Sequence, residues 1–228
     1  MDPVETPEAR DVPEVPVRRY WRLFVTVVAL FVVQAALSEG SVARVIEVLL
    51  AGTALVLASQ LESGGRRRQQ VAWAVASSSL AVAVAQALLP IEGDIGGGLL
   101  LVNGLLVAAG PVLVAQAIRR HPTISMNTVL GAITIYVLFG LFFAFVYRSI
   151  LLFDPGSFAS STGPLDPAAM QYFSFVTLTT VGFGDITAVT SAPRTLVALE
   201  ALLGQVYLVT VVAMVVGNVG RRRAPSNP

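Results

Sequence analysis

The residues whose types could do chemistry in this chain are gathered in one short segment, residues 177–185. Its sequence is Thr177-Leu178-Thr179-Thr180-Val181-Gly182-Phe183-Gly184-Asp185, which is rich in threonine hydroxyls and glycine. The two glycines allow backbone conformations that other residues adopt only at a steric cost. The segment lies between two long apolar stretches, and irregular backbone at membrane depth is tolerated only where protein encloses it or where it lines a polar path. We therefore interpret residues 177–185 as the lining of a polar path.

The residues just before this segment predict a short helix that positions it. Asp166 followed by Pro167 is typical of a helix start, because the carboxylate can cap the first turn and proline suits the first helical position. Residues 168–179 continue this helix, which is too short to cross a membrane. We expect it to enter the membrane and to return the chain through residues 180–185.

Residues 177–185 resemble the signature of potassium channels, in which four such loops meet around one axis. The resemblance implies a homotetramer in which K⁺ ions are coordinated by backbone carbonyl oxygens and the Thr180 hydroxyl. The implied selectivity filter consists of Thr180, Val181, Gly182, Phe183 and Gly184, with K⁺ held at the first four. Phe183 stands where tyrosine is usual, which removes a hydroxyl that can brace the filter.

The same resemblance implies roles for residues around the filter. Thr177, Thr179, Tyr172 and Asp185 would support it, and the Tyr172 hydroxyl could hydrogen-bond the Asp185 carboxylate. Gly204 lies 19 residues after Asp185, where such channels commonly carry a glycine in the inner helix. We expect Gly204 to act as a gating hinge, as a site of close helix packing, or as both.

Two ionisable residues near the predicted pore have alternative interpretations. Glu200 lies inside the last apolar stretch, where a carboxylate is expensive and is therefore a candidate for gating. Alternatively, Glu200 is a protonated or hydrogen-bonded group that braces the back of the pore helix near Thr177 or Thr179. His121 follows two arginines before the pore segment and is either an interfacial charge or a pH sensor.

The composition indicates a helical membrane protein. Of the 228 residues, 55% are hydrophobic and 13% are charged, against about 25% charged in a typical soluble domain, and the mean hydropathy is +0.75. Six apolar stretches have close to the length that crosses a bilayer, and none alternates like a barrel strand. They are Trp21–Leu37, Val42–Leu61, Val71–Leu89, Gly97–Ile118, Thr128–Phe153 and Pro193–Val219. The predicted fold class is an all-α integral membrane protein with six transmembrane helices, a re-entrant pore helix and a filter loop.

Arginine placement predicts the orientation of these spans. All 15 basic residues are arginine, and alternating spans put 12 of them on one side. Those 12 are Arg10, Arg18, Arg19, Arg22, Arg66, Arg67, Arg68, Arg119, Arg120, Arg221, Arg222 and Arg223. The positive-inside rule makes this side cytoplasmic, with both termini inside. We expect a multi-pass plasma-membrane protein of bacterial type with no cleavable signal peptide.

Four segments are predicted along the chain. Residues 1–19 form an acidic, proline-rich tail that is expected to be disordered, and residues 221–228 form a short basic tail. Residues 20–121 form a four-helix domain, and residues 122–220 form the pore domain. The fourth apolar stretch has no basic residue before Arg119, so the first domain lacks a voltage sensor. No cytoplasmic ligand-binding domain is expected in cis.

Several other classes of function are disfavoured. The chain has no cysteine and one histidine, which excludes thiolate chemistry and makes a histidine metal site implausible. No enzyme motif, cofactor site or nucleic-acid motif is present, so the expected partners are K⁺, membrane lipid and further copies of the chain. A potassium-uptake transporter would carry several pore loops in one chain, whereas one is visible here. A non-selective channel would usually have a disrupted filter, and a non-conducting subunit would not need an intact one.

Overall fold

The computed structural model describes residues 17–36, 41–61, 93–119 and 126–221, with isolated positions between 70 and 81. Its elements are α1 (Val17–Ala36), α2 (Ser41–Gln60), α4 (Gly93–Arg119), α5 (Met126–Phe153), β1 (Phe158–Ser160), α6 (Pro167–Leu178), β2 (Ile186–Ala188) and α7 (Ser191–Arg221). Most of the predicted third span, Val71–Leu89, lies outside the described residues. So do His121 and most of both predicted tails.

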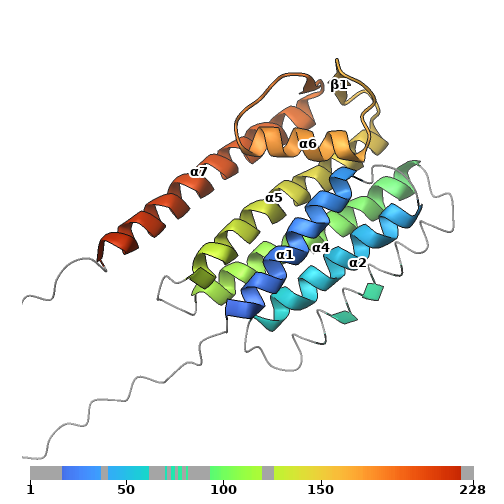
Figure 1. Cartoon of the computed structure of the whole chain (residues 1–228). Coiled ribbons are helices and arrows are strands. Elements are labelled where there is room, and N and C mark those ends of the chain that lie inside the picture. Colours follow the sequence, from blue (N-terminus) through green and yellow to red (C-terminus); the bar gives the residue numbers. More distant parts are fainter. Residues whose placement is uncertain are drawn as a thin grey trace, which may run out of the picture.

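Helices α1, α2, α4 and α5 pack side by side as a bundle (Figure 1). Their shared core contains Leu30 of α1, Ala54 of α2, Val107 of α4 and Leu138 of α5, all buried. At one end, the Arg19 guanidinium donates a hydrogen bond of 3.1 Å to the carbonyl oxygen of Gln60, which ties the start of α1 to the end of α2. The bundle therefore joins the first described helices to α5 in one core.

Helix α6 lies across the end of α5 at which β1 and β2 are found, and α7 runs beside α5 (Figure 1). Helix α6 contacts α1, α5 and α7, so it is held from three sides. The two strands pair antiparallel in the register Phe158 with Ala188 and Ser160 with Ile186. This ribbon closes the chain segment that carries α6 and the loop after it.

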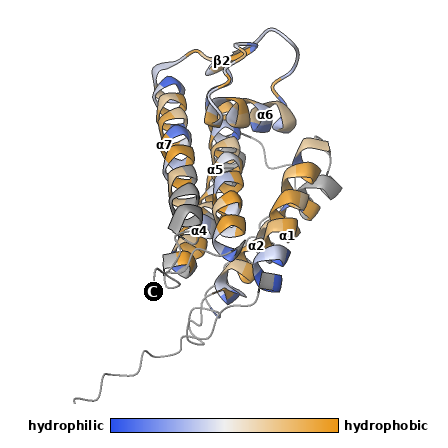
Figure 2. Ribbon diagram, turned by 60° about the vertical axis from the view of Figure 1, so that its left-hand side comes forward, coloured by the Kyte–Doolittle hydropathy of each residue, from blue (hydrophilic) through white to orange (hydrophobic). Residues whose placement is uncertain are grey.

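Apolar residues, in orange, predominate along the helices (Figure 2). Three described helices are long and apolar enough to cross a membrane, over Arg18–Ala36, Asn127–Phe153 and Ser191–Val211. Helices α2 and α4 carry shorter apolar stretches, Ile46–Gln60 and Leu101–Gln116. The chain is thus a mainly helical protein with apolar helices of membrane-spanning length.

The described helices agree with the sequence-based expectation to within a few residues at each end. Five of the six predicted apolar stretches and the predicted short helix after Asp166 are helical in the structure, and three of these helices have the length and composition of a membrane span. Two features were not anticipated. The β1–β2 ribbon adds a small sheet to a fold expected to be all-α, and α1 begins at Val17, so that residues 17–19 belong to the helix rather than to the tail.

Candidate ion-conduction site

Helix α6 is positioned by the cap that the sequence predicted. Asp166 adopts an extended conformation, and its side chain accepts a hydrogen bond of 2.7 Å from the backbone N–H of Ala169. Pro167 occupies the start of the helix, where its missing N–H costs nothing. The predicted helix start is confirmed. The opposite end of α6, at Leu178, leads directly into residues 180–184.

Residues 180–184, which we call the glycine loop, alternate in the sign of φ. Thr180, Gly182 and Gly184 have φ of 59°, 57° and 78°, whereas the residues between them do not have positive φ. Glycine adopts such values readily, but a threonine there is uncommon. Alternation of this kind lets successive carbonyl oxygens face the same side of the chain. The sequence predicted the two glycines for this role and missed Thr180.

The amide groups at the start of the glycine loop are bonded back to α6. The backbone N–H of Thr180 donates to the Thr177 carbonyl at 2.9 Å, and those of Val181 and Gly182 donate to the Val176 carbonyl at 3.0 and 3.3 Å. Among the described residues, no backbone N–H is recorded as a donor to the carbonyls of Thr180, Val181, Gly182 or Phe183. The loop therefore leaves a row of backbone oxygens available to a cation.

The predicted supporting threonines lie at the turn from α6 into the loop. Thr177 is buried, and its carbonyl accepts the Thr180 amide. Thr179 ends the helix, and its hydroxyl donates to the Phe175 carbonyl at 2.7 Å. Both residues thus fix the point at which the regular helix gives way to the alternating loop.

The far end of the glycine loop is held by Tyr172 and Asp185. The Tyr172 ring lies parallel to the Phe183 ring, with centroids 6.4 Å apart and an angle of 2° between the planes. Tyr172 lies near Asp185, and a hydrogen bond between the Tyr172 hydroxyl and the Asp185 carboxylate stays a prediction. The Asp185 carbonyl accepts from the backbone N–H of Ser161 at 2.9 Å. Position 183, where a tyrosine is usual, therefore contacts Tyr172 through aromatic stacking.

Behind α6, Gly204 of α7 packs directly against the last turn of the helix. A Cβ at Gly204 would collide with the backbone carbonyl oxygen of Leu178. The same oxygen accepts a hydrogen bond of 3.1 Å from the Tyr136 hydroxyl of α5. Gly204 is thus required for close packing against Leu178, which lies two residues before the start of the glycine loop.

Glu200 also faces α6, but its partners are not the threonines that the sequence suggested. The carboxyl group lies 2.6 Å from the Tyr147 hydroxyl and 2.5 Å from the Ser174 hydroxyl. Ser174 lies on α6 and Tyr147 on α5. The expected contact between Glu200 and the short helix α6 is present, one turn earlier than Thr177 or Thr179. A serine inside an apolar helix, opposite a glutamate inside another, was the signal that could have found this pair.

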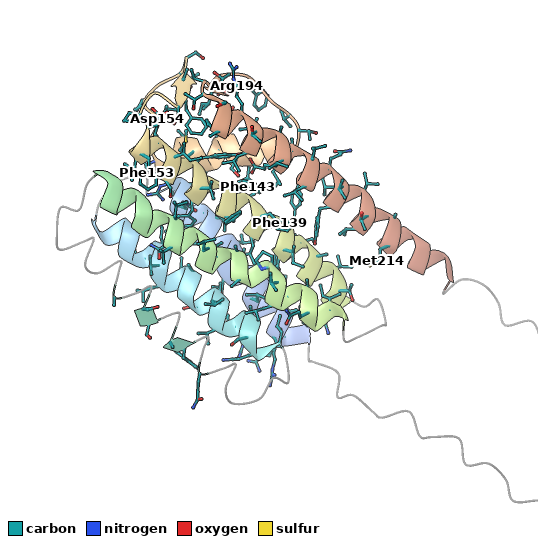
Figure 3. All side chains as sticks on the ribbon, turned by 180° about the vertical axis from the view of Figure 1, so that it is seen from behind. Phe139, Phe143, Phe153, Asp154, Arg194 and Met214 are labelled. Carbon is teal, nitrogen blue, oxygen red and sulfur yellow. The ribbon has the colours of Figure 1, made fainter. Side chains whose placement is uncertain are left out.

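One face of the site is open within a single chain. Val181 is 54% and Phe183 69% exposed, and the exposed apolar residues of α7 lie on the helix that follows the loop. Those exposed residues are Leu199, Leu202, Leu203, Val206, Leu208, Val209 and Met214. In Figure 3, Arg194 lies at the ribbon end of the molecule and Met214 far along α7 toward the other end. An apolar face of this length requires a cover of lipid or protein.

The capped short helix, the alternating loop after it and most of the two long apolar helices on either side lie within residues 131–220. Residues 131–220 match the family model described as "Ion channel". That family is a class of channels rather than of enzymes. The resemblance to potassium channels is confirmed for this part of the chain.

The relative that supports the potassium-channel resemblance is "Two pore potassium channel c" from Oryza sativa subsp. japonica. A stretch of 41 residues, 18% of this chain, is 54% identical to it. The stretch covers 9% of the rice protein, so the likeness concerns a short part of that channel. No solved structure matches the chain.

Proposed function

We propose that this protein is the subunit of a potassium-selective channel in which four copies of the glycine loop form the selectivity filter. The observation that carries the proposal is the alternation of positive φ at Thr180, Gly182 and Gly184. A dehydrated K⁺ needs oxygens on several sides, and rings of carbonyls from four chains can replace its hydration shell. The carbonyls of residues 180–183 and the Thr180 hydroxyl are the oxygens assigned to K⁺.

The proposed arrangement uses the surface that one chain leaves open. A cyclic tetramer puts the glycine loop on the axis and covers Phe183 and part of α7 with neighbouring copies. The carboxyl end of α6 points into the loop, so the negative end of its helix dipole favours a cation there. Stacked sites let successive ions repel one another forward, which permits selectivity without trapping.

The membrane arrangement is also a proposal. Six spans, with α6 entering the membrane from the outer side, put the start of α1 and the end of α7 in the cytoplasm. Arg18, Arg19 and Arg22 at the start of α1 agree with this orientation, since basic residues favour the cytoplasmic side. We assign the channel to the plasma membrane on the same grounds.

Stoichiometry and flux test this proposal together. Cross-linking of the purified protein in mild detergent should stop at four copies, and liposomes that contain it should release K⁺ down its gradient. A Gly182→Ala variant should assemble in the same way and release no K⁺. A protein that conducts as a monomer, or that assembles without conducting under any condition, would contradict the proposal.

A further inference from the structure

Glu200 is joined to α5 and α6 by a chain of oxygen contacts. We call Tyr147, Ser174 and Glu200 the Glu200 bridge. One carboxyl oxygen, Oε2, lies 2.6 Å from the Tyr147 hydroxyl, and the other, Oε1, lies 2.5 Å from Ser174 Oγ. Ser174 Oγ also lies 2.8 Å from the backbone carbonyl oxygen of Gly140. Four oxygen-bearing groups are therefore linked by three contacts.

Counting protons distinguishes the two forms of the carboxyl group. Each hydroxyl supplies one proton, and a backbone carbonyl can only accept. If Glu200 is ionised, only the hydroxyls of Tyr147 and Ser174 supply protons, so two protons serve three contacts. Ser174 can then donate either to the Gly140 carbonyl or to Oε1, and the other of these two contacts has no proton. A neutral Glu200 supplies the third proton. Oε1 then donates to Ser174, Ser174 donates to Gly140, and Tyr147 donates to Oε2.

The surroundings of Glu200 also favour the neutral carboxylic acid. Its side chain is 0% exposed, on a helix that is apolar over most of its length. In the described part of the chain no arginine pairs with Glu200, and Arg148 pairs with Glu47 instead. The titratable side chains near it are Tyr147 and Tyr136 on α5, while α6 presents the Ser174 hydroxyl. A buried carboxylate without a cation is expensive. Because short contacts also occur with ionised carboxylates, the argument for a neutral Glu200 depends on the proton count and not on the contact distances.

We propose that Glu200 is held as a neutral carboxylic acid that hydrogen-bonds α7 to the middle of α6, and that it is a positioning residue for the glycine loop. The bridge lies one turn before Gly204, which packs on the Leu178 carbonyl at the end of α6. The two contacts together fix α6 against α7 at two levels. Loss of the proton would leave one contact unfilled and loosen α6, which carries the glycine loop. This consequence for conduction rests on the proposed function, whereas the protonation state does not.

Infrared difference spectroscopy of the purified protein tests the protonation state directly. The spectrum of the parent minus that of Glu200→Gln at pH 7 should contain the carbonyl stretch of a protonated carboxyl group, and raising the pH should remove this band. Absence of the band at pH 7 in folded protein would overturn the proposal. Because this readout needs no ion flow, it stays valid if the protein proves not to conduct K⁺.

Thermal melting tests whether the three contacts act as proposed. Glu200→Gln keeps all of them, since its amide donates to Ser174 and its carbonyl accepts from Tyr147, so its melting temperature at pH 7 should match the parent. Glu200→Ala and Ser174→Ala should melt at least about 5 °C lower. Thr195→Ala is the control, because that hydroxyl bonds only within α7, to the Ser191 carbonyl. If the melting temperature of Glu200→Gln falls as far as that of Glu200→Ala, the proposal that Glu200 is a neutral acid is contradicted.

Channel recordings test the positioning role. The parent should lose open probability as the pH rises into the range where the infrared band disappears, and Glu200→Gln should not. Reversal potentials should be equal in the two proteins, because Glu200 does not touch the glycine loop. An identical pH profile in both proteins would show that the bridge does not position the loop. Failure of the parent to conduct at all would count against the proposed function and not against the neutral acid.

Discussion

Thr180 holds the left-handed conformation with φ of 59°, at a cost of about 1–2 kcal/mol for a residue other than glycine. The surrounding bonds determine this conformation, since its amide is tied to the Thr177 carbonyl and the next two amides to Val176. The structure therefore accepts local strain at the one position where a hydroxyl adds a further oxygen to the proposed filter. Gly182 and Gly184 adopt the same region without that cost.

Gly182→Ala is expected to abolish selective conduction. No atom lies within 4 Å of a Cβ built at this position in one chain, so the effect comes from the left-handed φ of 57° and from neighbouring copies around the axis. Relaxation to negative φ would turn a carbonyl out of the row. Gly98→Ala in α4 is the matched control, because its Cβ also meets no atom within 4 Å and its φ is ordinary. Bilayer recordings should show K⁺ currents in the control alone.

Gly204→Ala is expected to disturb the glycine loop through α6. Its Cβ meets the Leu178 carbonyl, a backbone atom that cannot move without shifting the end of α6. We therefore expect a lower melting temperature and reduced open probability, measured beside Gly98→Ala. If Gly204 is a hinge and no more, stability and conductance in the open state will be unchanged and only opening will be impaired. Full parental behaviour would show that neither role holds.

Among the helices, the start of α2 and the end of α5 are joined by a buried ion pair. The Arg148 guanidinium lies 3.6 Å from the Glu47 carboxylate, both side chains are nearly buried, and the guanidinium also lies 5.7 Å from the centre of the Phe145 ring. Charges inside a helical bundle of this kind are rare and are usually paired. The pair links the first part of the chain to the helix that precedes α6.

Removing one member of this pair should cost more than removing both. Glu47→Ala or Arg148→Ala removes one member of this buried ion pair, a change that costs about 3–5 kcal/mol in well-studied buried pairs. The double variant should regain part of that loss, giving a coupling energy on the order of 1 kcal/mol or more. Thermal melting of the two single variants and the double variant measures it. Strictly additive losses would show that the contact contributes no coupling.

Helix α1 is also part of the support of α6. The Gln171 side-chain amide donates to the Phe31 carbonyl at 2.9 Å, and the rings of Phe31 and Phe175 meet edge to face at 4.8 Å. The Phe175 ring occupies the space in front of Gly140, where a Cβ would approach it to 2.5 Å. The predicted division between a first domain and a pore domain therefore crosses a continuous core in the described residues.

Sequence patterns identified most elements of this molecule because they follow from local rules. The Asp166–Pro167 cap, the apolar lengths and the two loop glycines each depend on neighbouring residues. The partners of Glu200 depend on how α5, α6 and α7 pack, and no local pattern specifies whether Ser174 or Thr177 faces it. Positive φ at Thr180 was missed for a different reason, since the backbone bonds of residues 180–182 to Thr177 and Val176 impose it against the preference of the residue.

At the scale of the whole molecule, opening is expected not to be steeply voltage-dependent. Steep gating moves about 3–4 charges per subunit through the membrane field, and α4 offers no arginine before Arg119 at its end. Gating-current measurements should give no more than about one charge per subunit. A larger charge would mean that a voltage sensor lies elsewhere in the chain. Weak voltage dependence from ions moving in the filter is compatible with the account.

The reversal potential of the purified protein in a planar bilayer tests the central claim most directly. With K⁺ on one side and an equal concentration of Na⁺ on the other, current through a filter built from residues 180–184 should reverse far from zero, on the side set by the K⁺ gradient. The same measurement on Gly98→Ala should give the same value. A reversal potential near zero, with Na⁺ as permeant as K⁺, would contradict the account.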